Sequence, residues 1–198
     1  MTNLGTACAT VVLLAAAACN AIPVEAGTDG VLLEAITVRS RGVDVPATFV
    51  RPSGAAASPF PVVVLAHGHG GTRDEAGGFS RLAEALARRG IATIRPDFPG
   101  CGQSNEPFTR NNLSNMMADT RAALAHARRQ PEIDAKRTGI VGYSMGARVA
   151  MLVLPDGYAA AVLWAPVGLD GPEAVFPLAG GQSSYLELRE RAQSTGVT

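Results

Sequence analysis

The chain has 198 residues, of which 47% are hydrophobic and 17% are charged, with 17 basic and 17 acidic side chains. This length and apolar content suffice for one domain with its own core and exclude a disordered chain. A net charge of zero gives no long-range field to attract nucleic acid or anionic lipid, so neither is an expected partner. Three cysteines without a C-x-x-C pair support neither a disulfide framework nor a zinc ribbon.

The first residues have the composition of an export signal. No charged side chain precedes Glu25, and Cys8–Cys19 is an apolar run too short to span a bilayer as a helix. We therefore predict that residues 1–24 are a leader of a periplasmic or secreted protein and that 25–198 form the folded domain. The segment 16–19 is similar to a bacterial lipobox, in which Cys19 would carry a lipid and attach the protein to a membrane. A cytoplasmic protein with an alanine-rich start is the alternative.

Beyond this leader, two β-rich runs, Val31–Val38 and Val43–Val50, predict a hairpin. Continuously apolar runs, typical of buried strands, then alternate with segments whose apolar residues recur at helical spacing. The predicted strands are 61–66, 91–94, 138–142 and 160–164, and the predicted helices are 79–86, 113–127 and 147–154. Such alternation specifies an α/β fold, with a mainly parallel sheet and helices on both faces. Gly90 is placed to end the first helix, and a short further helix fits 185–192.

The segment Gly142-Tyr143-Ser144-Met145-Gly146 has the pattern G-x-S-x-G and joins a predicted strand to a predicted helix. A nucleophile elbow needs such a tight turn, because it holds the serine in a strained backbone conformation. The glycines let strand and helix approach without a Cβ clash, and the helix start places N–H groups beside the hydroxyl. We therefore predict Ser144 as a nucleophile, and the alternative is a glycine-rich connection without a catalytic duty.

A second glycine-rich segment, His67-Gly68-His69-Gly70-Gly71, follows the strand 61–66. Its glycines would let the backbone turn toward Ser144, so that the N–H groups of His69 and Met145 form an oxyanion hole. Two histidines two positions apart also suggest a metal, but no third ligand cluster accompanies them, and no metal or other cofactor is expected. The His67 side chain is expected to hold the loop rather than to do chemistry.

A third segment, Arg95 to Ser104, follows the strand 91–94. Within it, Asp97 is expected to hold the loop through hydrogen bonds to the main chain. The alternative, a catalytic acid, is less favoured.

Together the three segments resemble the α/β-hydrolase superfamily, above all its esterase, serine aminopeptidase-like and dienelactone hydrolase-like members. In that family an H-G-x motif, a D-x-x-G-x-G-x-S loop and a G-x-S-x-G elbow follow successive strands, as they do here over Val31–Val167. The resemblance implies a Ser/Asp/His triad that cleaves a small-molecule carboxylic ester, or an amide, through an acyl-Ser144 intermediate. Ser144 argues against the dienelactone hydrolase-like variant, which usually carries a cysteine at this position.

The family order is nucleophile, acid and then histidine, but no histidine follows Ser144 in this chain. Asp170 is the candidate acid, with Glu173 as the weaker one, and His126 is expected to face water on its helix. We therefore expect a C-terminally truncated chain of low activity, with an exposed apolar edge beside its last strand. The alternative is a non-catalytic hydrolase-fold remnant that acts as a binding module.

Overall fold

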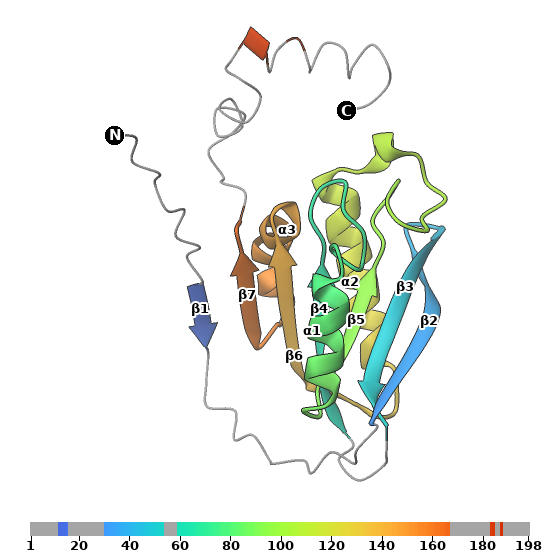
Figure 1. The fold of residues 1–198 in the computed structure, drawn as a ribbon, viewed down its shortest axis with the longest axis vertical. Coiled ribbons are helices and arrows are strands. Elements are labelled where there is room, and N and C mark those ends of the chain that lie inside the picture. Colours follow the sequence, from blue (N-terminus) through green and yellow to red (C-terminus); the bar gives the residue numbers. More distant parts are fainter. Residues whose placement is uncertain (1–11, 16–29, 54–58, 167–182, 185–186, 188–198) are drawn as a thin grey trace.

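The computed structural model describes residues 12–15, 30–53, 59–166, 183–184 and 187. Within them the strands form one sheet in the order β1-β7-β6-β4-β5-β3-β2 (Figure 1). The strands are β1 (Val12–Ala15), β2 (Val31–Ser40), β3 (Val43–Pro52), β4 (Phe60–Ala66), β5 (Ala92–Pro96), β6 (Ile133–Tyr143) and β7 (Ala160–Trp164). The helices are α1 (Gly78–Ala87), α2 (Leu113–Arg128) and α3 (Met145–Val153), with short 3-10 turns η2 (Phe108–Arg110) and η3 (Leu154–Asp156).

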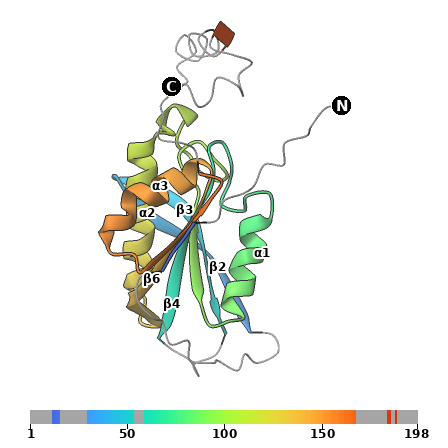
Figure 2. The ribbon, with the colours of Figure 1, turned by 90° about the vertical axis from the view of Figure 1, so that its left-hand side faces the viewer.

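The predicted architecture is confirmed. Strands β5, β4, β6 and β7 run parallel, and the predicted hairpin β2–β3 continues the sheet through an antiparallel pairing of β3 with β5. Helix α1 covers one face of the sheet, and α2 and α3 cover the other (Figure 2). The carboxyl ends of the parallel strands therefore meet at one edge of the sheet, where all three glycine-rich segments begin.

The hairpin turn has two residues, because Ser40 pairs directly with Val43. Arg41 and Gly42 have φ angles of 50° and 82°, and two successive positive φ angles define a type I′ turn. Gly42 accepts this conformation without strain. The side chain of Arg41 therefore projects from a rigid corner.

The cores on the two faces follow the predicted apolar periodicity. In α1 the buried side chains are Phe79, Ala83 and Ala87, one turn apart, and they pack against Leu65 of β4. On the other face the completely buried Val62 and Val64 of β4 meet α2 and α3. Each large apolar side chain buried in this way contributes about 1.5–3 kcal/mol. Helix α1 ends at Ala87, and Gly90 turns the chain back with a φ of 78°.

One expectation about the sheet is wrong. The outer side of β7 is not free, because β1 pairs antiparallel with it from Ala160 to Leu163. Strand β1 lies within residues 1–24, and the division into leader and domain stays a prediction. The helix expected at 185–192 falls outside the described residues, apart from the helical Glu187. In the described part of the chain, no helix is long and apolar enough to cross a membrane.

Candidate active site

Ser144 occupies a sharp corner between β6 and α3. Its backbone has φ 53° and ψ −117°, a conformation that costs a non-glycine residue free energy and that concentrates at functional sites. The glycines on both sides make the corner sterically feasible. A Cβ on Gly142 would overlap the main chain of Gly146, and a Cβ on Gly146 would overlap the carbonyl oxygen of Ala66. The sequence pattern therefore predicts this local geometry for a steric reason.

The main chain of the corner is fastened on both sides. The N–H of Ser144 donates to the carbonyl oxygen of Trp164 in β7 at 2.9 Å, and its carbonyl oxygen accepts from the N–H of Ala147 at 3.0 Å. Helix α3 begins at Met145, whose N–H lies in the first turn and has no acceptor within its own helix. The positive end of the helix dipole and this N–H therefore lie beside the half-buried Ser144 hydroxyl.

The loop after β4 lies directly against this corner. A Cβ built on Gly68 would be 3.3 Å from Cβ of Ser144 and 3.2 Å from the Tyr143 ring, so the main chain of Gly68 touches the elbow. The ring of Tyr143 in turn meets the half-exposed Trp164 edge to face, with centroids 5.8 Å apart. The structure thus brings together Ser144, Met145 and the segment that carries His69.

His67 has the structural role that the sequence predicts. Its side chain is fully buried, Nδ1 lies 2.8 Å from the carbonyl oxygen of Gly68, and Nε2 accepts from the N–H of Phe98 at 3.0 Å. These partners define the neutral tautomer with the proton on Nδ1. Burial lowers the pKa of His67, although the Gly68 carbonyl opposes this effect. With both nitrogens occupied, the ring joins the loop after β4 to the loop after β5.

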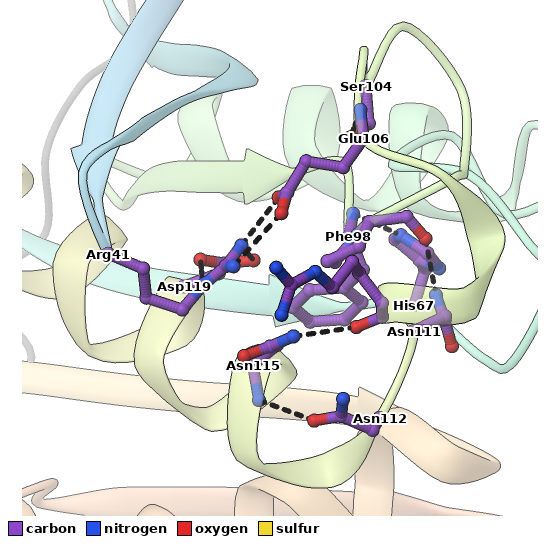
Figure 3. Close-up of polar contacts among 11 residues, drawn as sticks. Arg41, His67, Phe98, Ser104, Glu106, Asn111, Asn112, Asn115 and Asp119 are labelled. Carbon is purple, nitrogen blue, oxygen red and sulfur yellow. Dashed lines mark hydrogen bonds and ion pairs between the residues drawn. The ribbon is translucent and has the colours of Figure 1, made fainter. Parts of the chain in front are cut away.

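His69 turns its side chain toward the loop that precedes α2. Its Nδ1 lies 3.1 Å from Oδ1 of Asn111, and its ring lies 5.1 Å from the ring of Phe108. Asn111 is buried beside His67 and Phe98 (Figure 3) and donates its amide N–H groups to the carbonyl oxygen of Pro99 and to Sγ of Cys101. The sequence does not identify Asn111, because an asparagine before a helix is usually a cap, a role that Asn112 has here.

Asp97 holds its loop as predicted. The carboxylate is 1% exposed and accepts from the N–H and the guanidinium of Arg73 and from the N–H of Gln103, at 2.8–2.9 Å. A Cβ on Gly102 would overlap this carboxylate. The contacts with Arg73 tie this loop to the loop after β4, and the contact with Gln103 closes the loop on itself.

The remaining candidates do not join the site. His126 lies in the last turn of α2 and hydrogen bonds with Gln130. Helix α2 ends just before β6 begins, at the end of the sheet opposite to the elbow (Figure 1). The expectation that it faces water is wrong in part: the side chain is half-buried, and burial lowers its pKa. Asp170 and Glu173 lie outside the described residues.

A charged network beside the site was not predicted. Arg41, at the hairpin turn, donates to the carboxylates of Glu106 and of Asp119 at 2.6–3.0 Å (Figure 3). Asp119 is completely buried, which raises its pKa, while Arg41 opposes that shift. The network attaches the hairpin to α2 and to the loop that carries Asn111. The sequence contains one signal of this network. Asp119 lies three residues after Met116 on the apolar stripe of its helix, and a charged residue at such a position indicates a buried charge that needs a partner.

The chain belongs to the alpha/beta hydrolase family, whose family model matches residues 63–195. Among curated proteins, the Quorum-quenching protein AidA of Acinetobacter baumannii (strain MDR-ZJ06) is 33% identical over 108 residues, which are 54% of this chain and 34% of that protein. The chain therefore spans about a third of the length of this relative.

Several solved esterase structures share the fold of this chain. An esterase of Pyrococcus furiosus has a TM-score of 0.61 and 20% identity, covering 84% of this chain and 62% of the esterase. Est1E from Butyrivibrio proteoclasticus, solved with ferulic acid bound, has a TM-score of 0.56 and 22% identity, covering 62% of this chain and 49% of Est1E. A cold-adapted esterase from an Arctic intertidal metagenomic library is 25% identical with a TM-score of 0.52, and the match covers 64% of this chain and 56% of that esterase.

Proposed function

We propose that the whole protein is a serine hydrolase that cleaves a small-molecule carboxylic ester, or less readily an amide, through an acyl-Ser144 intermediate. The observation that carries this proposal is the strained Ser144 corner with the main chain of Gly68 packed against it. Such a corner costs free energy, and a plain strand-to-helix connection has no need of it. The esterases among the structural neighbours support the ester class.

In the proposed reaction, Oγ of Ser144 attacks the carbonyl carbon while its proton passes to a base. The negative charge that develops on the carbonyl oxygen is stabilised by the N–H groups of His69 and Met145 and by the positive end of α3. The alcohol then leaves with a proton, and water hydrolyses the acyl-Ser144 ester. A serine rather than a cysteine at this position favours simple esters over the dienelactone hydrolase-like variant.

The base determines the rate. The family order places the acid and then the histidine after Ser144, with Asp170 as the proposed acid. His67 has both nitrogens occupied, His69 turns its side chain toward Asn111, and His126 lies at the far end of α2. We therefore expect the 198-residue polypeptide to retain only an acceleration of about 10³ to 10⁴ over water, against about 10⁹ for an intact triad.

A fluorophosphonate probe tests the nucleophile, because it phosphonylates an activated serine. In the whole protein, we expect stoichiometric labelling that is lost in Ser144→Ala and retained in the control Ser114→Ala, which alters an exposed serine at the start of α2. Folded protein without labelling would instead favour the second candidate, a hydrolase-fold binding module. The absence of a histidine after Ser144 is the observation that supports this candidate.

We further propose that the protein is exported, with the segment 1–24 as its leader. Cell fractionation and mass spectrometry of the mature N-terminus test this. A lipid-modified Cys19 would place the protein in the membrane fraction, and Cys19→Ser would release it. A cytoplasmic protein that retains Met1 or begins at Thr2 would contradict export.

A further inference from the structure

The carboxylate of Glu75 lies inside the loop that follows β4. Its Oε2 accepts a hydrogen bond from the N–H of Gly68 at 2.7 Å. A Cβ on Gly71 would lie 3.0 Å from the same oxygen, so the glycine-rich loop wraps closely around the carboxylate. The side chain of Glu75, seven residues further along the chain, therefore accepts from the N–H of Gly68, the residue that touches Ser144.

The backbone at Glu75 is strained. Glu75, Ala76 and Gly77 have φ angles of 42°, 51° and 80°, three successive residues in the left-handed region. Only the glycine adopts this region without a steric cost. The turn is closed by the N–H of Glu75 on the carbonyl oxygen of Thr72 and by the N–H of Gly78 on that of Glu75, both at 2.9 Å. The surrounding structure thus maintains a costly conformation at the residue that faces the loop.

The other side of Gly68 is also fixed. Its carbonyl oxygen accepts from Nδ1 of His67 at 2.8 Å and from the N–H of Gly71 at 3.1 Å. The peptide bond between Gly68 and His69 is planar and trans, so the His69 N–H points opposite to that carbonyl. A glycine rotates freely about its two dihedral angles unless the flanking peptide groups are held. Here Glu75 holds the preceding peptide group, while His67 and Gly71 hold the following one.

We propose that Glu75 is a positioning residue of the oxyanion hole. Its carboxylate locks Gly68 so that the N–H of His69 is aimed at the oxygen of a carbonyl bound at Ser144. This inference rests on the proposed function and adds to it a residue that neither motif contains. In this role Glu75 acts through the main chain of the loop and not on the substrate itself.

The test uses the complete protein and the rate of labelling by a fluorophosphonate, whose phosphoryl oxygen occupies the oxyanion hole. Loss of one oxyanion donor costs about 10² to 10³ in rate, so we expect Glu75→Ala, which only releases that donor, to lower the maximal labelling rate about 10- to 100-fold. The probe concentration that gives half the maximal rate should change little, because initial binding does not need the hole. Glu75→Gln should restore most of the rate, since its amide oxygen accepts from the Gly68 N–H.

Glu84→Ala is the matched control, because Glu84 is an exposed glutamate on α1 that pairs with Arg88, and it should label at the wild-type rate. If Glu75→Ala does not fold, Glu75→Asp serves in its place: it retains the charge, but one methylene fewer withdraws the oxygen from Gly68. Labelling of Glu75→Ala or Glu75→Asp at the wild-type rate would overturn the inference while leaving the proposed function intact. A loss that only follows a lower melting temperature would show a merely structural role. Unlabelled wild-type protein would refute both.

Discussion

The guanidinium of Arg41 and the carboxylate of Asp119 share two hydrogen bonds of 2.9 Å across 78 positions of sequence. Removing Arg41 would leave the buried Asp119 charge unpaired, so we expect Arg41→Met to destabilise the protein by about 3–5 kcal/mol. Replacing both residues, Arg41→Met with Asp119→Leu, should cost clearly less, because the completely buried Asp119 charge is then gone, while Glu106 loses Arg41 equally in both variants. Urea denaturation measures both changes.

The control for this pair lies in the same hairpin. Arg39 and Asp44 form an ion pair in which both side chains are 67% exposed. Exposed pairs contribute about 0–1 kcal/mol, so Arg39→Met should change the free energy of unfolding by no more than that. A double variant as unstable as Arg41→Met alone would contradict the account based on an unpaired buried charge.

The glycines of the elbow provide a second prediction. A Cβ at Gly146 would overlap the carbonyl oxygen of Ala66, which is main chain and has no room to move. We expect Gly146→Ala to destabilise the fold by about 3 kcal/mol or more and to abolish labelling of Ser144. Gly78→Ala is the matched control: nothing lies within 4 Å of its Cβ position in α1, and it should be neutral or stabilise by up to about 1 kcal/mol.

Stability should fall in mild acid because of His67. Burial lowers its pKa in the folded state, so below the ordinary value of 6.5 the unfolded chain takes up a proton that the folded chain refuses. The free energy of unfolding therefore decreases as the pH falls below about 6.5, by up to about 1.4 kcal/mol per pH unit. His126, whose pKa burial also lowers, adds to this slope. In a His126→Gln background, His67→Gln should flatten the curve between pH 5 and 6.5, and an unchanged slope would assign it to other groups.

Tyr158 carries a hydroxyl that has no hydrogen-bond partner within the described part of the chain, although it is buried. Burial raises the pKa of Tyr158, so the hydroxyl stays neutral. Because its desolvation is not compensated, Tyr158→Phe should stabilise the protein by about 1 kcal/mol. The buried Thr138 is the contrast: its hydroxyl contacts Arg128 and the carbonyl oxygen of Gly157, so Thr138→Val should destabilise by a similar amount. Thermal denaturation of the two variants distinguishes these signs.

Much of the fold could be predicted because its signals are local. Apolar residues of α1 recur one turn apart, β4 is a continuous apolar run, and the Ser144 corner needs glycines at fixed distances along the chain. The contacts that organise the site are not local. Arg41 contacts Asp119 only because the hairpin packs beside α2. Apolar periodicity predicts elements along the chain, but it does not predict a contact between residues 78 positions apart.

Glu75 could not be predicted for a different reason. It lies in a loop, where no hydrophobic pattern constrains the side chain, and its partner is a main-chain N–H that every sequence offers. The structural role of His67 was easier to predict, because a histidine that directly follows a buried strand has few ways to expose its side chain to solvent. Asp170 lies beyond the described residues, so its assignment as the acid stays a prediction from the family order.

The ring of His67 has a consequence for anyone who exchanges loops between proteins of this family. Because its two nitrogens serve the main chain of two different loops, at Gly68 and at Phe98, neither loop is an independent module. A chimera that imports the first loop without this imidazole would leave the buried N–H of Phe98, in the second loop, without its hydrogen-bond acceptor. Successful grafts should therefore transplant both loops together, and recombination libraries with a crossover between residues 67 and 98 should be depleted in folded members.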